Sequence, residues 1–540
     1  MNPAHAALKA KFRAGQHAEA IAECEALCRD NPGDIDSARL CATMQLMVRN
    51  FARARELLGQ VHRHAPADAD VLFNLGMCER ELGNFAAAAD HFRAYADRFP
   101  GHADGWASLA ECKLHLGAAE EGIELAERAL QIDAAFVPAW SVRGRCEQAL
   151  GRHEQAIATF NRAIQLAPND ADLRQQRGDA WEQLGGLREA AEDYRVVLAL
   201  RPADEQALKK ATLCLLHAGE GALAIQVCRD VLKAQPDSLA ARLGAEWLVS
   251  QMVPLWHVPM MNEAERNRAY EEGLRGAVSA DKTVFEIGTG SGLVAMMAAR
   301  LGARKVVTCE AEGLVADAAM KIVARNGYQD RVKVLHKPSF GVDAQRDLGG
   351  RADILVHEIF SSELLGEHVL PALEDAKARL LKPGGEILPA AASIMVALVG
   401  GEELGRELRV QDSFGFDLRP FNAIQPRKRP LHREDLPRVL LSEAVEAFRF
   451  DFQQHDTFPP EKKRLELPVV DGGLCWGVIQ WIRIDFGRGV LFENHPSRSR
   501  AVASWQQAVY LFDEPRQVEP GQVVPVRAMH DRSRPWFEAA

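Results

Sequence analysis

Prolines recur through the first half of the chain at intervals of 34 residues or of twice that number. They stand at Pro32, Pro66, Pro100, Pro168, Pro202 and Pro236, and Ala134 fills the missing place. Glycines keep the same period, with Arg49 as the exception, at Gly15, Gly83, Gly117, Gly151, Gly185 and Gly219. Five residues after each of these glycines, and after Arg49, stands a small residue: Ala20, Ala54, Ala88, Gly122, Ala156, Ala190 and Ala224. This period predicts a stack of structural repeats.

Each repeat is predicted to be a pair of helices. Glycine ends the first helix, the small residue lets the second helix approach closely, and proline marks the connection to the next pair. The pattern resembles the tetratricopeptide repeat family, with seven repeats over residues 1–238. The resemblance implies an all-α solenoid that binds peptide or protein ligands on its concave face. The alternative is that the repeats only space or dimerise the protein.

Residues 239–256 continue the helical pattern but lose its glycine and proline punctuation. They predict a capping or linker helix that covers the last repeat. The larger apolar residues of this segment are expected in a core or an interface rather than in a binding site; they are Trp247, Leu248, Met252 and Trp256.

The composition limits the classes of function. The 540 residues carry 65 Lys and Arg against 75 Asp and Glu, which disfavours broad nucleic-acid binding. No stretch approaches the roughly 20 apolar residues of a membrane span, and the N-terminus lacks a signal core, so a cytoplasmic location is expected. The ten cysteines lack the spacing of zinc ligands and are expected to be reduced thiols, with no metal site.

A different pattern begins near residue 283. An apolar run over 284–287 predicts a buried strand, and the turn after it allows close approach of a ligand at Gly288, Gly290 and Gly292. Glu310 ends the next apolar run, 22 residues after Gly288, where a carboxylate can accept hydrogen bonds from two ribose hydroxyls. This order predicts a nucleotide-binding α/β unit.

The glycine spacing is GxGxG rather than GxGxxG, and Glu286 stands two residues before the first glycine. With ADILVHE over 352–358 and ARLLKPGGEILP over 378–389, this resembles class I S-adenosylmethionine-dependent methyltransferases. The resemblance implies a Rossmann-like domain, S-adenosylmethionine as cofactor, and a supporting role for Glu286 at the glycine turn. A dinucleotide-dependent enzyme is the alternative.

The segment EIFSSELLGE over 358–367 places carboxylates at Glu358, Glu363 and Glu367. An arginine guanidinium is planar, delocalised and protonated, and hence a poor nucleophile. Two carboxylates can fix its plane and leave one terminal nitrogen aimed at a methyl donor. The alternative is that Glu358 caps the next helix while the other two glutamates are solvated.

This segment resembles the double-glutamate loop of protein arginine N-methyltransferases. HVPMMNEAERN over 257–267 and SWQQAVY over 504–510 are similar to two further segments of that family, in the same order. The resemblance implies that Glu358 and Glu367 grip a substrate guanidinium, whereas Glu363 matches no gripping residue. It implies cofactor contacts for the three glycines and for the following residues: Arg266 with the carboxylate, Glu310 with the ribose and Ser339 with the base. It also implies a methyl-transfer channel at Met260, Ser504 and Trp505.

The chain departs from the family at three places. It has no tyrosine between Tyr194 and Tyr270, so cofactor closure must use other residues. The family's adenine-contacting acid is absent from 336–340, and Ser504 replaces a histidine. The motifs EIGTGSGL, MKIVARNG and ELLGE, together with the helical repeats, most resemble the outlying monomethylating (type III) branch and a repeat-bearing symmetric-dimethylating relative.

The expected domains are therefore a methyltransferase domain over 257–389 and a β-barrel substrate domain over 390–540. Within the latter, 412–435 lies where the family has a dimerisation arm; its basic run PRKRP could instead be a solvated loop. Only one catalytic module is present, so a homodimer is expected.

The sequence predicts a protein arginine N-methyltransferase whose substrates, proteins with accessible arginines, are recruited in part by the repeats. The alternative is a weak or inactive methyltransferase fold kept as a scaffold, with the repeats mediating protein interaction. A methyltransferase for a small molecule or RNA is disfavoured by the paired glutamates and the net charge of −10.

Overall fold

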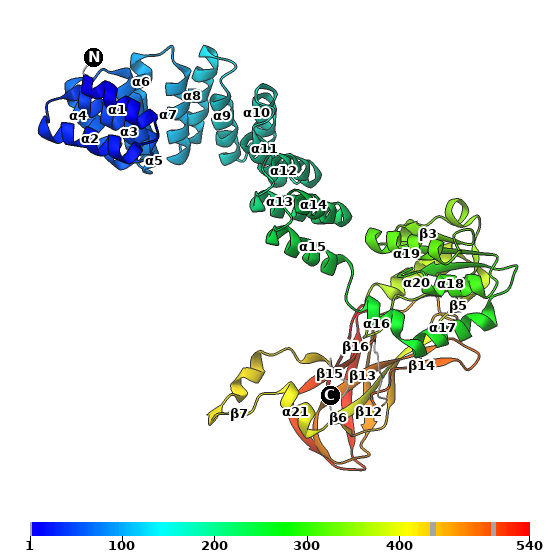
Figure 1. Cartoon of the computed structure of the whole chain (residues 1–540). Coiled ribbons are helices and arrows are strands. Elements are labelled where there is room, and N and C mark those ends of the chain that lie inside the picture. The colour runs from blue at the N-terminus through cyan, green and yellow to red at the C-terminus, as the bar shows by residue number, and fades with distance from the viewer. Residues whose placement is uncertain (1–2, 432–438, 498–503) are drawn as a thin grey trace. The chain divides into compact units, whose positions relative to one another are not determined.

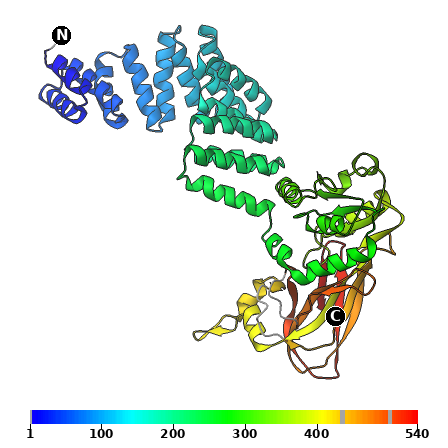
Figure 2. The same ribbon diagram turned by 45° about the vertical axis from the view of Figure 1, so that its right-hand side comes forward.

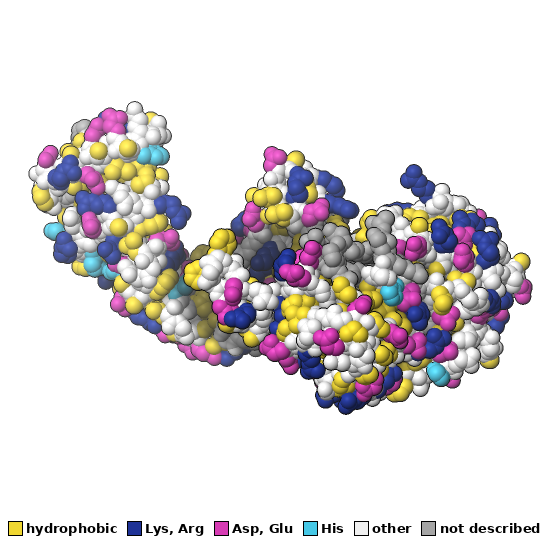
Figure 3. Space-filling view, turned by 90° about the horizontal axis from the view of Figure 1, so that it is seen from below, with side chains coloured by type: hydrophobic (Ala, Val, Ile, Leu, Met, Phe, Trp, Pro, Cys, Tyr) yellow, Lys and Arg dark blue, Asp and Glu magenta, His cyan; other side chains and the backbone are white. Residues whose placement is uncertain are grey.

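The structure is a computed structural model that describes residues 3–431, 439–497 and 504–540. It divides into two compact units, Met1–Val249 and Ser250–Ala540. Within the described residues, no helix is long and apolar enough to cross a membrane. On the face that Figure 3 shows, Lys and Arg side chains are interspersed with Asp and Glu.

The first unit consists of helix pairs stacked in a row (Figures 1 and 2). The pairs are α1 (Pro3–Arg13) with α2 (His17–Asp30), α3 (Ile35–Met47) with α4 (Phe51–His64), α5 (Ala69–Glu81) with α6 (Phe85–Arg98), α7 (Ala103–His115) with α8 (Ala119–Ile132), α9 (Val137–Ala149) with α10 (His153–Leu166), α11 (Ala171–Leu184) with α12 (Leu187–Leu200), and α13 (Glu205–His217) with α14 (Gly221–Ala234). Helix α15 (Leu239–Met252) follows. The described residues thus form seven helix pairs in the region where seven repeats were predicted.

The periodic residues have the predicted local roles. The six glycines between paired helices have φ between 73° and 85°, and Arg49, the exception, has φ 61°. The six alanines that follow are fully buried at the helix contacts. Gly122 takes their place in α8, where an added Cβ would lie 2.7 Å from Cys146 Sγ. Close helix approach therefore determines the small residue at this position.

The ten cysteines are free thiols, nine of them buried and Cys28 half-buried. Burial raises the pKa of several thiols in the repeat unit to about 11: Cys78, Cys112, Cys146, Cys214 and Cys228. They fill the space between helices as small apolar groups.

The second unit begins with a five-stranded parallel sheet of order β3-β2-β1-β4-β5. Its elements are α16 (His257–Asn262), α17 (Ala264–Ala277), β1 (Thr283–Ile287), α18 (Leu293–Arg300), β2 (Lys305–Glu310), α19 (Gly313–Arg325), β3 (Val332–His336), the 3-10 helix η1 (Ser339–Gly341), the short helix η2 (Ala344–Leu348), β4 (Ala352–His357), α20 (Val369–Arg379) and β5 (Leu381–Leu388). The strand order changes direction at β1, so the ends of β1, β2 and β4 meet at one edge, where ligands bind in such sheets.

Antiparallel strands make up most of the rest of the unit. One sheet has the order β10-β6-β13-β15-β9, with β11 on β6 and β14 on β13, and a second has the order β12-β16-β17. The strands are β6 (Ala391–Gly400), β9 (Lys428–Leu431), β10 (Val439–Leu440), β11 (Val445–Asp451), β12 (Glu461–Pro468), β13 (Gly473–Asp485), β14 (Leu491–Glu493), β15 (Gln507–Val518), β16 (Val523–His530) and β17 (Pro535–Ala539). The predicted β-rich region is confirmed, whereas the predicted closed barrel is not.

The predicted arm over 412–435 is described as far as residue 431, and 432–435 lie outside the described residues. After α21 (Glu402–Leu408) it forms the hairpin of β7 (Asp412–Ser413) and β8 (Phe416–Asp417), then the 3-10 helix η3 (Arg419–Ile424). Its basic run is in part strand β9, paired with β15, rather than a loop. Several apolar side chains of the arm are exposed: Phe414, Phe416, Phe421 and Ile424.

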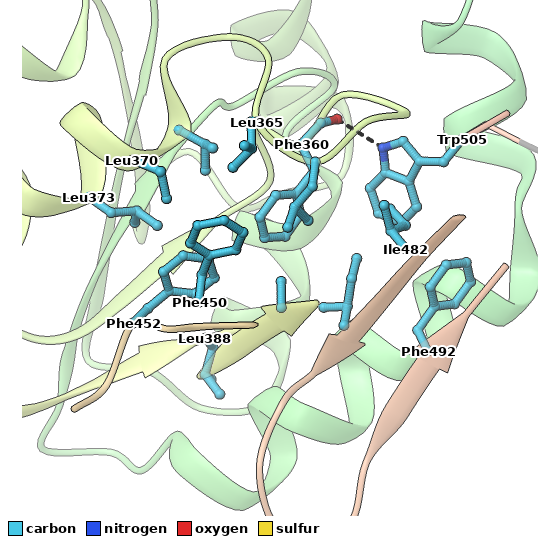
Figure 4. Close-up of a cluster of buried hydrophobic side chains, with 14 of the residues drawn as sticks. Phe360, Leu365, Leu370, Leu373, Leu388, Phe450, Phe452, Ile482, Phe492 and Trp505 are labelled. Atoms are coloured by element: carbon cyan, nitrogen blue, oxygen red, sulfur yellow. Dashed lines mark hydrogen bonds between the residues drawn. The ribbon is translucent and has the colours of Figure 1, made fainter. Parts of the chain in front are cut away.

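An aromatic core lies between the parallel sheet and the antiparallel strands (Figure 4). Phe360, from the loop after β4, stacks on Phe452 after β11 with ring centroids 6.1 Å apart. Trp505 Nε1 donates a hydrogen bond to the Phe360 carbonyl at 2.8 Å (Figure 4). This core holds the loop after β4 and the chain before β15 against each other.

Candidate active site

The glycine turn after β1 is held by β2. The backbone N–H groups of Gly288 and Thr289 both donate to the Cys309 carbonyl at 3.1 Å. Gly290, at φ 51°, donates to Glu310 Oε2 at 3.1 Å. An added Cβ on Gly288 would lie 2.7 Å from Ile359 Cγ2. The turn thus brings Glu310 and the loop after β4 close together.

Three residues predicted at the cofactor, Arg266, Glu286 and Gly292, do not line the cavity beside this turn. Gly292, at φ 78°, is the N-cap of α18, and an added Cβ would lie 3.1 Å from Val323 Cγ2, so it serves helix packing. Glu286 is buried in β1, and burial raises its pKa to about 8. The described residues donate no hydrogen bond to its Oε2.

A cavity of about 420 Å³ opens at the ends of β1, β2 and β4. Its walls include both predicted gripping carboxylates and most of the predicted cofactor residues. The predicted residues that line it are Met260, Gly288, Gly290, Glu310, Ser339, Glu358 and Glu367. Met260 and Glu367, far apart in sequence, therefore meet in one cavity, as the motif order predicted.

Glu358 and Arg266 form a buried ion pair beside the cavity. Arg266 Nη2 lies 2.9 Å from Glu358 Oε1, and the two side chains are 3% and 8% exposed. Burial raises the pKa of Glu358, and the Arg266 guanidinium opposes that rise. The guanidinium also lies over the rings of Tyr270 and Trp505, 5.1 and 5.4 Å from their centroids. The resemblance predicted a cofactor carboxylate as the partner of Arg266, whereas here its partner is Glu358.

Glu367 lies on the rim of the same cavity and is exposed. Its backbone has φ 56°, an uncommon conformation for a residue other than glycine. Loss of hydration raises its pKa, and the carboxylates of Glu358 and Glu310 raise it further. Glu363 instead forms an ion pair with Lys428 and does not line the cavity. The cavity is therefore built to attract a cation between acidic groups.

Ser504 and Trp505 lie behind the cavity wall rather than in it. The Ser504 backbone N–H donates to Glu263 Oε2 at 3.0 Å, and its hydroxyl donates to the same oxygen. Glu263 is buried and precedes α17. These bonds place the Trp505 ring over Arg266, so the predicted channel residues support the ion pair instead.

Several residues that line the cavity were not predicted there. Trp256 and Met252 were expected in a core or an interface, but both line the cavity, because the chain after α15 runs along its wall. Others include His257, Lys337 and His368. The HxxM segment could have indicated His257. Phe340, which was expected to pack on the base beside Ser339, also lines the cavity.

The described residues fit S-adenosylmethionine. Gly290 leaves room in the cavity, since an added Cβ would lie 3.7 Å from Met260 Cε. Glu310 offers a carboxylate at the end of β2, where ribose hydroxyls are commonly bound. Apolar and aromatic side chains beside η1 offer a surface for a base, with Phe340 52% exposed.

Comparisons with known families agree with this geometry. Tetratricopeptide repeat models match residues 46–103, 80–136 and 176–238, and a second such model matches 115–178. A model described as ribosomal protein L11 methyltransferase (PrmA) matches 271–391, which spans the parallel sheet.

Individual relatives identify the family. An arginine N(omega)-methyltransferase of Streptomyces achromogenes subsp. streptozoticus is 36% identical over 299 residues, 55% of this chain and 82% of that protein. Protein arginine N-methyltransferase 7 of Danio rerio is 30% identical over 308 residues, 52% of this chain and 45% of that protein. The match thus spans just under half of the Danio rerio relative. A solved Trypanosoma brucei PRMT1 enzyme–prozyme complex with AdoHcy is 21% identical, covering 52% of this chain and 88% of that one, with TM-score 0.45. The chain belongs to the S-adenosylmethionine-dependent protein arginine N-methyltransferase family and carries tetratricopeptide repeats before its methyltransferase unit.

Proposed function

We propose that residues 250–540 transfer a methyl group from S-adenosylmethionine to a guanidinium nitrogen of arginine in protein substrates. One observation carries this proposal: Glu358 and Glu367 line the same cavity as the glycine turn at Gly288 and Gly290. The Streptomyces relative, named for an arginine Nω-methyltransferase, supports the same acceptor chemistry.

In this proposal Glu358 and Glu367 have different roles in binding the guanidinium. Glu358 is buried, and Arg266 opposes the rise in its pKa that burial causes, which favours the ionised carboxylate. Glu367 lies on the rim and meets the guanidinium as it enters. Hydrogen bonds from two guanidinium nitrogens to these carboxylates fix the plane of the group and draw its positive charge toward them. The third nitrogen is thereby oriented for attack.

Bound S-adenosylmethionine supplies a sulfonium methyl group, which is already a reactive electrophile. The chain contributes position and exclusion of water, with Gly288, Gly290 and Glu310 on one side and Met260 on the other. No covalent intermediate with the protein is needed, because the chain accelerates methyl transfer by orienting the reacting groups and by electrostatic stabilisation.

The repeats and the arm suggest two further roles. We propose that the repeats bind protein or peptide ligands and so recruit substrates. The exposed apolar side chains of the arm, Phe414 and Ile424 among them, support a homodimer in which this surface is covered.

Free thiols suit a reducing compartment, and we infer a cytoplasmic location.

The test is a double variant, Glu358→Gln with Glu367→Gln. Purified protein is incubated with labelled S-adenosylmethionine and a cell lysate, and labelled residues are mapped by mass spectrometry. With the natural protein we expect label on arginine side chains of lysate proteins. With the double variant this labelling should fall by about 100-fold or more. Binding of S-adenosylhomocysteine, measured by calorimetry, should persist.

Glu363→Gln is the control for loss of a carboxylate from this loop, because it removes one negative charge at a residue outside the cavity. Free L-arginine is offered in parallel to separate a protein acceptor from the free amino acid. Unchanged labelling in the double variant would remove the assignment of both glutamates. Absence of label despite cofactor binding would favour the scaffold alternative.

A further inference from the structure

The chain between α15 and α16 forms an aromatic wall of the cavity. Trp256 stacks on His257 with ring centroids 4.1 Å apart and an interplanar angle of 10°. Both residues line the cavity that contains Glu358 and Glu367. A parallel stack at this distance fixes the plane of the smaller imidazole ring.

One contact determines which nitrogen of His257 carries the proton. Nδ1 of His257 lies 3.0 Å from the carbonyl oxygen of Pro254. A carbonyl oxygen only accepts hydrogen bonds, so Nδ1 carries the hydrogen in the neutral ring. Nε2 is then a hydrogen-bond acceptor in a cavity that already presents carboxylates.

The position of the imidazole depends on few contacts. The backbone bonds of this segment are local: His257 N–H donates to the Pro254 carbonyl at 3.2 Å, and Met260 N–H donates to the Trp256 carbonyl at 3.0 Å. The neighbouring Leu255 is 87% exposed and Val258 60% exposed, so neither side chain packs this turn into an apolar core. Among the described residues, the Trp256 indole is the aromatic ring that stacks on the imidazole.

We propose that Trp256 is a positioning residue, which holds the imidazole of His257 so that Nε2 accepts a hydrogen bond from the cationic part of a molecule in the cavity. The shared chemistry is an N–H of a cation, either the ammonium group of the cofactor or the guanidinium of the methyl acceptor. The proposal rests on the function proposed above for the identity of the ligands. The stack and the Pro254 contact do not depend on it.

A double-mutant cycle tests whether Trp256 acts through His257. The variants are Trp256→Leu, His257→Phe and their combination; phenylalanine keeps a ring that can stack but lacks nitrogen. The readouts are the dissociation constant of S-adenosylhomocysteine and the KM for an arginine-containing peptide. Coupling of aromatic pairs is about 0.5–1.5 kcal/mol, so Trp256→Leu alone should weaken one readout about 2- to 12-fold.

In the His257→Phe background, Trp256→Leu should have almost no further effect, because the acceptor nitrogen is already gone. A change in the dissociation constant identifies the cofactor as the ligand, and a change in KM alone identifies the methyl acceptor. Additive effects, or no effect of Trp256→Leu on either readout, would overturn the proposal. Trp256→Phe should restore most of the affinity.

Trp247→Leu is the matched control, because Trp247 is 45% exposed on α15 and does not line the cavity. A cofactor-independent measurement is the ¹⁵N spectrum of the histidine rings, with His257 assigned by its loss in His257→Phe. The natural protein should show the Nδ1–H form, and Trp256→Leu should shift His257 toward the Nε2–H form. An unchanged spectrum would contradict the positioning role even if the protein bound no cofactor.

Discussion

Arg266 favours the ionised form of Glu358, because the two groups form a buried ion pair and the guanidinium opposes the rise in the pKa of Glu358 that burial causes. A buried carboxylate without a partner takes up a proton, and a protonated Glu358 would bind a guanidinium weakly. The rings of Tyr270 and Trp505 add a second source of attraction for the Arg266 guanidinium. Ser504 acts one step further away, since its bonds to Glu263 place Trp505.

Glu286 should make the stability of the catalytic unit depend on pH. Burial raises its pKa from 4.5 to about 8. Between these values the unfolded chain has lost the proton and the folded chain retains it, so stability falls as pH rises. Glu286→Gln lacks this penalty. Its stability relative to the natural protein should therefore increase from pH 5 to pH 8, on the order of 3–5 kcal/mol.

Denaturant unfolding without ligand at pH 5, 6.5 and 8.5 measures this difference. Asp281→Asn is the control, because Asp281 is an exposed acid of the same unit whose lowered pKa, caused by the Ser279 hydroxyl, predicts no such rise. A Glu286→Gln difference that stays constant over this range would contradict the buried, protonated state of Glu286.

The residue types of the site could be predicted because they stand in short motifs after strands. The contacts of Arg266 could not, because they depend on how α16 and α17 dock against the loop after β4. Trp256 was misplaced for a related reason. A tryptophan at the end of an apolar helix has the pattern of a core residue, and only the path of the chain after α15 brings it to the cavity.

At the scale of elements, each repeat uses the same packing contact. A small residue in the second helix of the pair lies against the neighbouring helices. Gly122→Ala should destabilise the repeat unit by about 1–3 kcal/mol, because its Cβ would lie 2.7 Å from Cys146 Sγ and 3.3 Å from the Ala110 carbonyl. Gly59→Ala, inside α4 with no atom within 4 Å of the new Cβ, should stabilise it by about 0.5–1 kcal/mol.

Chemical denaturation followed by circular dichroism measures both changes. Opposite signs are the expected result, since the two substitutions are chemically identical and differ only in the space around the added methyl group. A loss of stability of the same size at both positions would indicate that backbone conformation, not packing, selects glycine at Gly122.

The repeats were predictable because each helix pair contacts chiefly its neighbours in sequence. The antiparallel strands were predictable one by one, from apolar runs such as SIMVALV in β6. Their pairing was not, since β6 joins both β13 and β11 across long stretches of chain. Whether the sheets close depends on such distant pairs, and here the predicted barrel is not confirmed.

At the scale of the whole molecule, the two units have separate hydrophobic cores. We expect two unfolding transitions in calorimetry, of which S-adenosylhomocysteine shifts only one. At a concentration of 100 times its dissociation constant, the ligand should add about 2.7 kcal/mol to the stability of the unit that binds it.

The transition that shifts should be the one in which the far-ultraviolet circular dichroism signal of β-sheet disappears. The reason is that the cavity lies in residues 250–540. A single transition that moves as a whole on adding ligand would contradict the independence of the two units. Glu310→Ala, which removes the carboxylate from the end of β2, should abolish the shift and leave the other transition in place.

The cysteine thiols of the repeat unit should react very slowly with electrophilic reagents. Its buried thiols include several with pKa about 11, among them Cys78 and Cys228. At pH 7.5 only about one such thiol in 3,000 is a thiolate, the form that reacts with maleimides or peroxide. A cysteine introduced on an exposed helix face would outcompete them by orders of magnitude. The repeats should therefore accept a fluorescent label at a chosen site without removal of any natural cysteine.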